Sequence, residues 1–232
     1  DPSRRFYQSA SVAEDGVGIL LDERRLRTPK GAEFAAPTPK LAVAIAEEWN
    51  AQGEHIEPAS MPLTQLAFAA VDHTSARRDE LADYIAKFGE TELVCHRAEG
   101  PSALVARQAM LWDPLVAWSA RDLGVVLSVV TGVAPAPPHA EALETLRAHA
   151  AACDDFQLTA LSQATGAAGS AIVALALLHG RLNAESAFAV AALEDVWSVE
   201  NWGEDPEARA RLDAQRRELE NVQRFLTLLS AS

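Results

Sequence analysis

The chain has 232 residues, of which 49% are hydrophobic and 23% charged, and its formal net charge is −13 at pH 7. This composition is typical of a folded protein with one substantial core or two smaller ones. The negative charge argues against nonspecific binding to nucleic acid and against attraction to anionic membranes, since both need clustered Lys and Arg. A protein partner with a basic surface remains compatible with this charge.

Cysteine usage and hydropathy suggest a compartment. Cys95 and Cys153 lie far apart, without a disulfide framework or metal-ligand spacing, so we expect buried free thiols in a reducing compartment. The most apolar run, residues 171–178, is about half as long as a bilayer-spanning helix. We find no secretory signal. We therefore expect a cytoplasmic protein without membrane insertion, monomeric when free.

The first part of the chain predicts strands and the rest predicts helices. Short apolar runs separated by Gly- and Asp-containing turns predict an antiparallel meander over residues 6–12, 17–21 and 24–28, followed by a further short extended piece at 33–36. From Thr38 onward the apolar spacing becomes helical, with Thr38 as N-cap and Pro39 at the first helical position. The fold class is α+β, with a small β domain and linking helix at residues 1–60 and a larger all-helical domain at 61–232.

The expected helices follow from capping residues, prolines and apolar periodicity. Asp113-Pro114 is typical of an N-cap followed by proline at N1, so we predict a helix break there and a new helix up to Gly124. Residues 125–130 are either extended or a helix continuation. Further helices are predicted at 62 onward, 79–88, 101–112, 138–151, 156–165, 169–179, from the cap Asn183 into an acidic segment, and from Pro206 to the end.

The acidic segment at residues 192–204 is the best candidate for a binding surface. Indoles flanked by carboxylates are typical of surfaces that hold another protein, so we predict partner-binding roles for Glu194, Glu200, Trp202 and Trp197. The alternative is that its two tryptophans anchor a helix end in the core.

Four further residues are predicted to be structural. Trp49 and Trp112 lie on apolar helical faces and are expected in the core, and Arg97 and Asp113 are expected to form an internal ion pair.

No catalytic motif is present in the sequence. Gly16-Val17-Gly18 lacks the third glycine and the following helix of a phosphate loop, and the six histidines show no metal-ligand spacing. We therefore expect no catalytic residue, no metal and no cofactor. The alternative class is a hydrolase or small-ligand enzyme with a site in the cleft between the two domains, using Cys95, His96 or Glu92. A general holdase with many clients is a third possibility.

Several phrases together resemble one family, the "ATP twelve" assembly chaperones of the ATP synthase catalytic head. No single phrase is specific, but their order and spacing extend over essentially the whole chain. The matching residues are Arg5-Phe6-Tyr7, the run from Leu21 to Pro29, the run from Leu41 to Gln52, Met61-Pro62-Leu63-Thr64, the run from Leu93 to Ala98, Gln108, Trp112-Asp113-Pro114, Ser170 with the residues after it, and Glu200-x-Trp202-Gly203.

Two positions depart from the family pattern. Trp197-Ser198 stands where the family usually has Tyr-Gln, and Glu92 stands where it has an aspartate. An aromatic side chain is kept at the first position and an acid at the second.

The resemblance implies the fold described above, in an alphaproteobacterial-type member of a family whose eukaryotic members act in the mitochondrial matrix. It also implies a non-enzymatic function: binding the free alpha subunit of the catalytic head and shielding its interface until the beta subunit joins. An unassembled ring subunit exposes apolar surface that aggregates, so such a chaperone needs affinity and no nucleotide hydrolysis.

Overall fold

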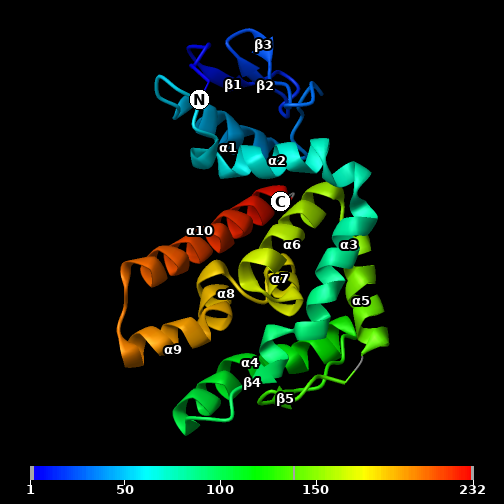
Figure 1. Cartoon of the computed structure of the whole chain (residues 1–232). Helices are drawn as coiled ribbons and strands as arrows, with labels where there is room; N and C mark the ends of the chain where they lie inside the picture. The colour runs from blue at the N-terminus through cyan, green and yellow to red at the C-terminus, as the bar shows by residue number, and fades with distance from the viewer. Residues whose placement is uncertain (1–2, 138, 231–232) are drawn as a thin grey trace. The chain divides into compact units, whose positions relative to one another are not determined.

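A computed structural model describes residues 3–137 and 139–230 of the chain (Figure 1). The chain forms two compact units. The first comprises Asp1–Arg78, Asp154–Ala160 and Arg224–Ser232, and the second comprises Asp79–Cys153 and Leu161–Gln223. The first unit is larger than the β domain expected at residues 1–60, because helix α2 (Pro62–Asp72) packs against α1 (Pro39–Asn50). The boundary at residue 60 stays a prediction about where the domains divide.

The predicted antiparallel meander is confirmed for its three strands at the start of the first unit (Figure 1), whereas residues 33–36 form only isolated bridges, at Glu33 and Ala35. It consists of β1 (Ala10–Val12), β2 (Ile19–Leu21) and β3 (Arg24–Arg25), in that order. Asp22, at the two-residue turn between β2 and β3, has φ 54°, the left-handed conformation that such hairpin turns require. Its carboxylate also accepts hydrogen bonds from the backbone N–H groups of Gln8 and Ser9.

The free edge of β1 is closed by a side chain of α1. The Asn50 side-chain oxygen accepts a hydrogen bond from the Ala10 N–H at 2.7 Å, and its amide nitrogen donates to the Ala10 carbonyl at 2.7 Å. Asn50 therefore occupies the hydrogen-bonding groups that an exposed edge strand would offer to another strand.

Capping residues set the helix starts of the first unit. Thr38 caps α1 through a hydrogen bond from the Leu41 N–H at 3.2 Å, and Pro39 occupies the first turn, as predicted. Helix α2 begins at Pro62, also as predicted, but its N-cap residue makes no side-chain bond. The buried carboxylate of Glu48 replaces that cap and accepts bonds from the N–H groups of Leu63 and Thr64 at 2.9 and 2.7 Å. Burial raises the pKa of Glu48.

The second unit is mostly helical, with one short parallel pair of strands. Residues 124–129 have no regular structure and lead into the second of these strands at Val130, so the helix continuation expected as one alternative for this region is wrong. The elements lying wholly in this unit are η3 (Phe88–Thr91), η4 (Leu93–Cys95), β4 (His96–Arg97), α4 (Ser102–Leu123), β5 (Val130–Thr131), α5 (Ala140–Ala151), α7 (Ala171–Leu178), α8 (Ala184–Ala191) and α9 (Leu193–Trp202).

Further helices complete the description. The helices α3 (Arg78–Lys87), α6 (Asp155–Ala168) and α10 (Pro206–Leu229) each contribute residues to both units, and η1 (Pro58–Ser60) and η2 (Thr74–Ala76) lie in the first. Residue 138, the expected start of one helix, lies outside the described residues.

The predicted helix break at Asp113-Pro114 is wrong. Helix α4 runs without interruption from Ser102 to Leu123, with Pro114 inside it, and ends as predicted at Gly124 in the left-handed conformation. The Asp113 carboxylate pairs with Arg97 instead of capping a new helix. Trp112, Leu115 and other residues of α4 are buried on both sides of the proline, and this packing outweighs the single backbone hydrogen bond that proline removes.

The end of the helical region also differs from the expectation. Asn183 caps α8 with a full capping box, as predicted, but α8 ends before the acidic segment. A turn at Ala192 separates it from α9, which begins at Leu193. The acidic segment is therefore mostly a separate ten-residue helix, with its own first turn at Glu194 and Asp195.

Candidate partner-binding surface

Helix α9 carries all four predicted partner-binding residues and packs against α4 and α8. Leu193 is its only fully buried residue, so almost the whole helix is accessible or partly accessible. Glu194, Trp197 and Glu200 recur every three residues and therefore follow one side of the helix. We call these three residues, together with Trp202 and the α4 residue Arg107, the α9 surface.

Glu194 is tied to the interior of the second unit. Its carboxylate accepts a hydrogen bond from the amide nitrogen of Gln108, at 2.9 Å. Gln108 is fully buried, and its other side-chain atom accepts from the Ala98 N–H, also at 2.9 Å. This chain of bonds satisfies a buried amide and fixes the position of α9 on α4.

Arg107 joins the remaining two residues on this side of the helix. Its guanidinium pairs with the Glu200 carboxylate at 2.8 Å and lies over the Trp197 ring, 5.0 Å from the ring centroid. Both partners of the ion pair are partly accessible to solvent, so the pair orients the side chains more than it stabilises the fold. Trp197 is half-buried beneath Arg107 and is held at the surface of the unit.

Trp202, at the end of α9, is 85% exposed. An indole this exposed contributes little to the stability of the fold. Exposed aromatic side chains are typical of sites that bind a partner. Met110, which follows Arg107 by one turn of α4, is also exposed, by 67%. The alternative in which both indoles of α9 anchor the core therefore does not hold for Trp202.

A groove of about 340 Å³ lies beside α9, between it and neighbouring parts of α8 and α10. Apolar side chains form part of its lining, and Glu200, Glu204 and Asp213 contribute carboxylates. Arg216 covers one wall by stacking over Phe188 at 4.0 Å from the ring centroid. The apolar lining residues are Phe188, Val196, Val199 and Leu212.

The four residues expected to be structural are either buried or joined in an ion pair within their own unit. Trp49 and Trp112 are 7% and 0% exposed, and the Trp112 Nε1–H donates to the Val190 carbonyl at 3.0 Å. The predicted ion pair is present, with Arg97 Nη1 2.7 Å from an Asp113 carboxylate oxygen. Arg97 also stacks on Trp112, at 5.6 Å.

Of the residues named for the hydrolase alternative, Cys95 and Glu92 are buried within the second unit and His96 is partly buried. Burial raises the pKa of the Cys95 thiol to about 12, with a further contribution from Glu92, so the thiol is protonated at neutral pH and unsuited to nucleophilic attack. The His96 ring nitrogen Nδ1 lies 2.8 Å from the Glu92 carbonyl oxygen, so this nitrogen faces the backbone.

Glu92 has a structural environment of its own. It is 1% exposed, and its carboxylate accepts from the Ser170 hydroxyl and from the N–H groups of Ala171 and Ile172 at 3.1 and 3.4 Å, at the start of α7. Ser170 caps this helix, as its sequence position predicts. Burial raises the Glu92 pKa from 4.5 to about 7, and the hydrogen bonds oppose part of that rise.

The sequence did not identify Arg107 or the groove as parts of the candidate site. Arg107 and Glu200 are 93 positions apart, so no local pattern links them. Periodicity within α9 and α10 would place Val196, Val199 and Leu212 on apolar faces, but core residues share that pattern.

Neither a candidate metal centre nor a membrane-spanning helix occurs in the part of the chain that the structure describes. Within residues 3–137 and 139–230, no group of three or more His, Cys, Asp or Glu side chains is placed to hold a metal ion. Over the same ranges, none of the helices has the length and apolar character needed to cross a membrane.

Comparisons with known proteins give the same family for the first half of the chain and for most of its length. The family model described as ATP12 chaperone protein matches residues 4–120, which is half of the sequence. The mitochondrial protein atp12 of Schizosaccharomyces pombe is 29% identical over 214 residues, covering 86% of this chain and 74% of that protein.

Solved structures extend the match to α9. The crystal structure of Atp12 from Paracoccus denitrificans is 40% identical, with a TM-score of 0.92 over 98% of this chain and 99% of that one. Atu1473, a putative chaperone from Agrobacterium tumefaciens, is 37% identical, with a TM-score of 0.85 over 96% of this chain and 86% of that one. The chain belongs to the ATP12 chaperone family.

Proposed function

We propose that this protein is an assembly chaperone that binds the free alpha subunit of the ATP synthase catalytic head and shields its interface until the beta subunit joins. The α9 surface and the adjacent groove form the contact region in this proposal. The chaperone acts as a monomer in the bacterial cytoplasm, without a cofactor and without catalysis.

The observation that carries the proposal is Trp202, an indole 85% exposed on the helix that also carries the ion-paired Glu200 and contributes to a groove of about 340 Å³ with apolar and charged lining residues. Protein interfaces concentrate their binding free energy in aromatic anchors and apolar contacts that are surrounded by polar and charged groups. Membership of the ATP12 chaperone family supports the functional class, and the resemblance to alpha-subunit chaperones supports the partner.

The carboxylates of this region favour a partner with a basic edge. Glu200, Glu204 and Asp213 line the groove together with Arg209 and Arg216, and the chain as a whole has a net charge of −13. Complementary charge speeds the encounter and rejects wrong partners, while the buried apolar contacts supply most of the affinity.

The test is affinity capture of the full chain from a bacterial lysate, followed by identification of the bound proteins. We expect the alpha subunit without the beta subunit. Recovery of the intact catalytic head, or of no ATP synthase subunit, would contradict the proposal. Recovery of many unrelated proteins would favour the general holdase.

A Trp202→Ala variant tests the contact region. Because the indole is exposed, we expect unchanged thermal stability and a dissociation constant for the alpha subunit raised about tenfold, the size of an interface hot spot. Val133→Ala is the matched control, since Val133 is also fully exposed but lies outside α9. Equal binding by both variants would remove Trp202 from the interface.

A Glu200→Lys variant tests the charged rim. Lysine at this position faces Arg107, so the ion pair is replaced by repulsion between two exposed groups. We expect slower association with the alpha subunit and little change in stability. Loss of folding would instead assign Glu200 a structural role.

A further inference from the structure

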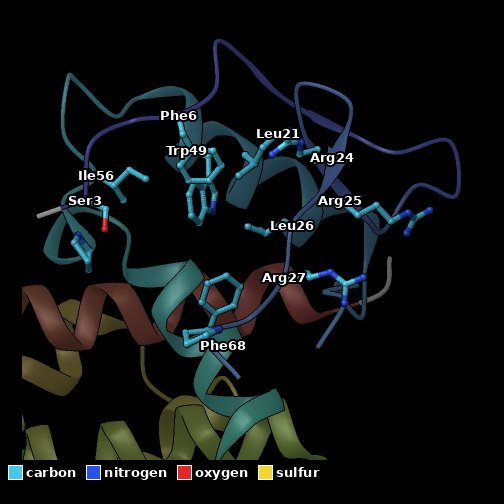
Figure 2. Close-up of a pocket in the computed structure, with 12 residues that line it drawn as sticks. Ser3, Phe6, Leu21, Arg24, Arg25, Leu26, Arg27, Trp49, Ile56 and Phe68 are labelled. Carbon is cyan, nitrogen blue, oxygen red and sulfur yellow. The ribbon is translucent and has the colours of Figure 1, made fainter. Parts of the chain in front are cut away.

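The first unit contains a cavity that the proposed function does not use. Its volume is about 530 Å³, within the range of about 300–1,000 Å³ typical of ligand pockets. Figure 2 shows apolar side chains from the sheet, from α1 and from α2 around it, among them Leu21, Leu26, Trp49 and Phe68. Phe6, which is 65% exposed, also lines the cavity. Apolar side chains gathered around a depression are one mark of a ligand-binding groove.

Trp49, one of the residues that line the cavity, has a hydrogen-bond donor without an acceptor among the described residues. Trp49 is only 7% exposed, and its indole Nε1–H finds no partner among the described residues. The rest of the indole is well fixed, since Tyr7 packs against it and donates a hydrogen bond to the Trp49 carbonyl at 2.6 Å. A buried donor left unpaired costs about 1–3 kcal/mol. An acceptor atom supplied by a ligand would recover that free energy.

The charged lining of the cavity is positive. Three arginines, Arg24, Arg25 and Arg27, contribute to it, and none of its described lining residues is acidic. Arg25 is engaged by Asp15 and Glu33, and Arg27 donates to the Gly31 carbonyl at 2.9 Å. The Arg24 side chain has neither an ion pair nor a hydrogen bond with any residue that the structure describes. The Arg24 side chain is exposed, so a carboxylate of a partner molecule can reach it.

We propose that this cavity is a second docking site, which binds an extended segment of a protein partner containing a tyrosine followed by an acidic residue. The tyrosine ring enters the apolar cavity, its phenolic oxygen accepts the Trp49 Nε1–H, and the neighbouring carboxylate pairs with Arg24. The site differs in charge from the acidic α9 surface. It does not depend on the alpha subunit being the partner there.

The structure favours side-chain insertion over strand addition. Asn50 already bonds both backbone groups of Ala10, so the β1 edge does not offer that position to an incoming strand. A tyrosine supplies an aromatic ring for an aromatic cavity and an acceptor for a buried donor in one side chain. Phenylalanine would leave the Trp49 donor unpaired.

Short peptides test the proposal on the full chain. The probe is the peptide acetyl-Gly-Tyr-Asp-Gly-amide, and the readout is the indole ¹⁵N–¹H resonance of Trp49, assigned among the five tryptophans with a Trp49→Phe variant. We expect a saturable shift of this resonance with a dissociation constant of about 1 mM. The Tyr→Phe peptide should bind about threefold to tenfold more weakly, the value of one hydrogen bond.

Arg24→Glu supplies the charge test without touching the core. This variant should lose affinity for the Asp peptide and prefer a peptide with Lys in that place, whereas Arg121→Glu, an equal charge change in the second unit, should bind like the unmodified protein. Because Arg24 is exposed, the variant folds even if Trp49→Phe does not. Trp202→Ala should leave the peptide titration unchanged, which separates this site from the α9 surface.

Three outcomes would overturn the proposal. The first is a Trp49 resonance that does not move with the Tyr-Asp peptide. The second is equal affinity for free 4-hydroxyphenylacetate, which would make the cavity a small-carboxylate site. The third is a shift that depends on the concentration of the protein itself, which would assign the cavity to a second copy of the chain.

Discussion

The buried carboxylate of Glu92 makes the stability of this protein depend on pH in an unusual direction. Its pKa is about 7 in the folded state and 4.5 when unperturbed, so the folded state binds more protons between these values. The resulting stabilisation is complete below pH 4.5 and is lost as the pH rises through 7. A tenfold change in proton affinity corresponds to about 1.4 kcal/mol, so the free energy of unfolding should fall by about 2–3 kcal/mol between pH 5 and pH 8 through this group alone.

The perturbation that isolates this contribution is Glu92→Gln, measured by urea denaturation at several pH values. Glutamine does not titrate, so the difference in unfolding free energy between the unmodified chain and the variant should shrink by about 2–3 kcal/mol from pH 5 to pH 8. The absolute cost of the variant also contains the changed hydrogen bonds to Ser170, Ala171 and Ile172, but that cost does not vary with pH.

Asp15→Asn is the matched control for this titration. Hydrogen bonds from Gly18 and Arg25 lower the pKa of Asp15 from 3.8 to about 2, so both values lie below pH 5. Its effect on stability should therefore be the same at pH 5 and pH 8. Parallel curves for Glu92→Gln and the unmodified chain would contradict this expectation, because they would mean that the three hydrogen bonds and the start of α7 keep Glu92 ionised despite its burial.

Three other variants or reagents test the structure. Pro114→Ala should raise the free energy of unfolding by about 1–2 kcal/mol in urea, because alanine restores the missing backbone hydrogen bond inside α4. A decrease would mean that the proline ring makes contacts of greater value. Asp113→Ala should lower the free energy of unfolding by about 1–3 kcal/mol, because Arg97 is largely buried and its Nη2 atom already lacks a partner among the described residues. Asp122→Ala is the control: it removes one partner of an exposed ion pair and should change the free energy of unfolding little. Iodoacetamide should label Cys95 about a hundredfold more slowly than a free thiol, and rapid labelling of the folded chain would revive the hydrolase alternative.

The parts of the fold that the sequence predicted well are governed by local chemistry. Thr38, Ser170 and Asn183 cap helices because a side-chain oxygen reaches a backbone N–H three residues later. The meander was also predictable from local sequence, because its turn residues lie between short runs of strand-forming residues. At Asp113-Pro114 the local signal was misleading, because Arg97 engages the aspartate and the packing of α4 overrides the proline.

Contacts between residues distant in sequence were beyond such reasoning. Glu48 caps α2 from another helix, and Gln108 reaches Glu194 across 86 positions. The cavity beside Trp49 combines residues from the N-terminal segment, the sheet, α1 and α2, each of which appears in the sequence as an ordinary apolar or basic side chain. The same holds for the groove beside α9. A depression is formed by what neighbouring elements leave unfilled, and no periodicity encodes it.

The structure changes the contribution to partner binding that we expect from the acidic segment. In the sequence its carboxylates form a negative patch, but several have partners within the same unit: Glu194 has Gln108, Asp195 has Arg211 at 3.5 Å, Glu200 has Arg107 and Glu204 has Arg209. Carboxylates paired in this way attract a basic partner less strongly than free ones would. Their stronger effect is to hold α9 on α4 and against α10.

Because α9 is held in this way, Trp202 and the groove need no further ordering of the helix before they contact a partner. Preorganised aromatic contacts lower the entropy lost on association. The affinity of the α9 surface should therefore depend more on Trp202 and the apolar lining of the groove than on the charges that first mark it in the sequence.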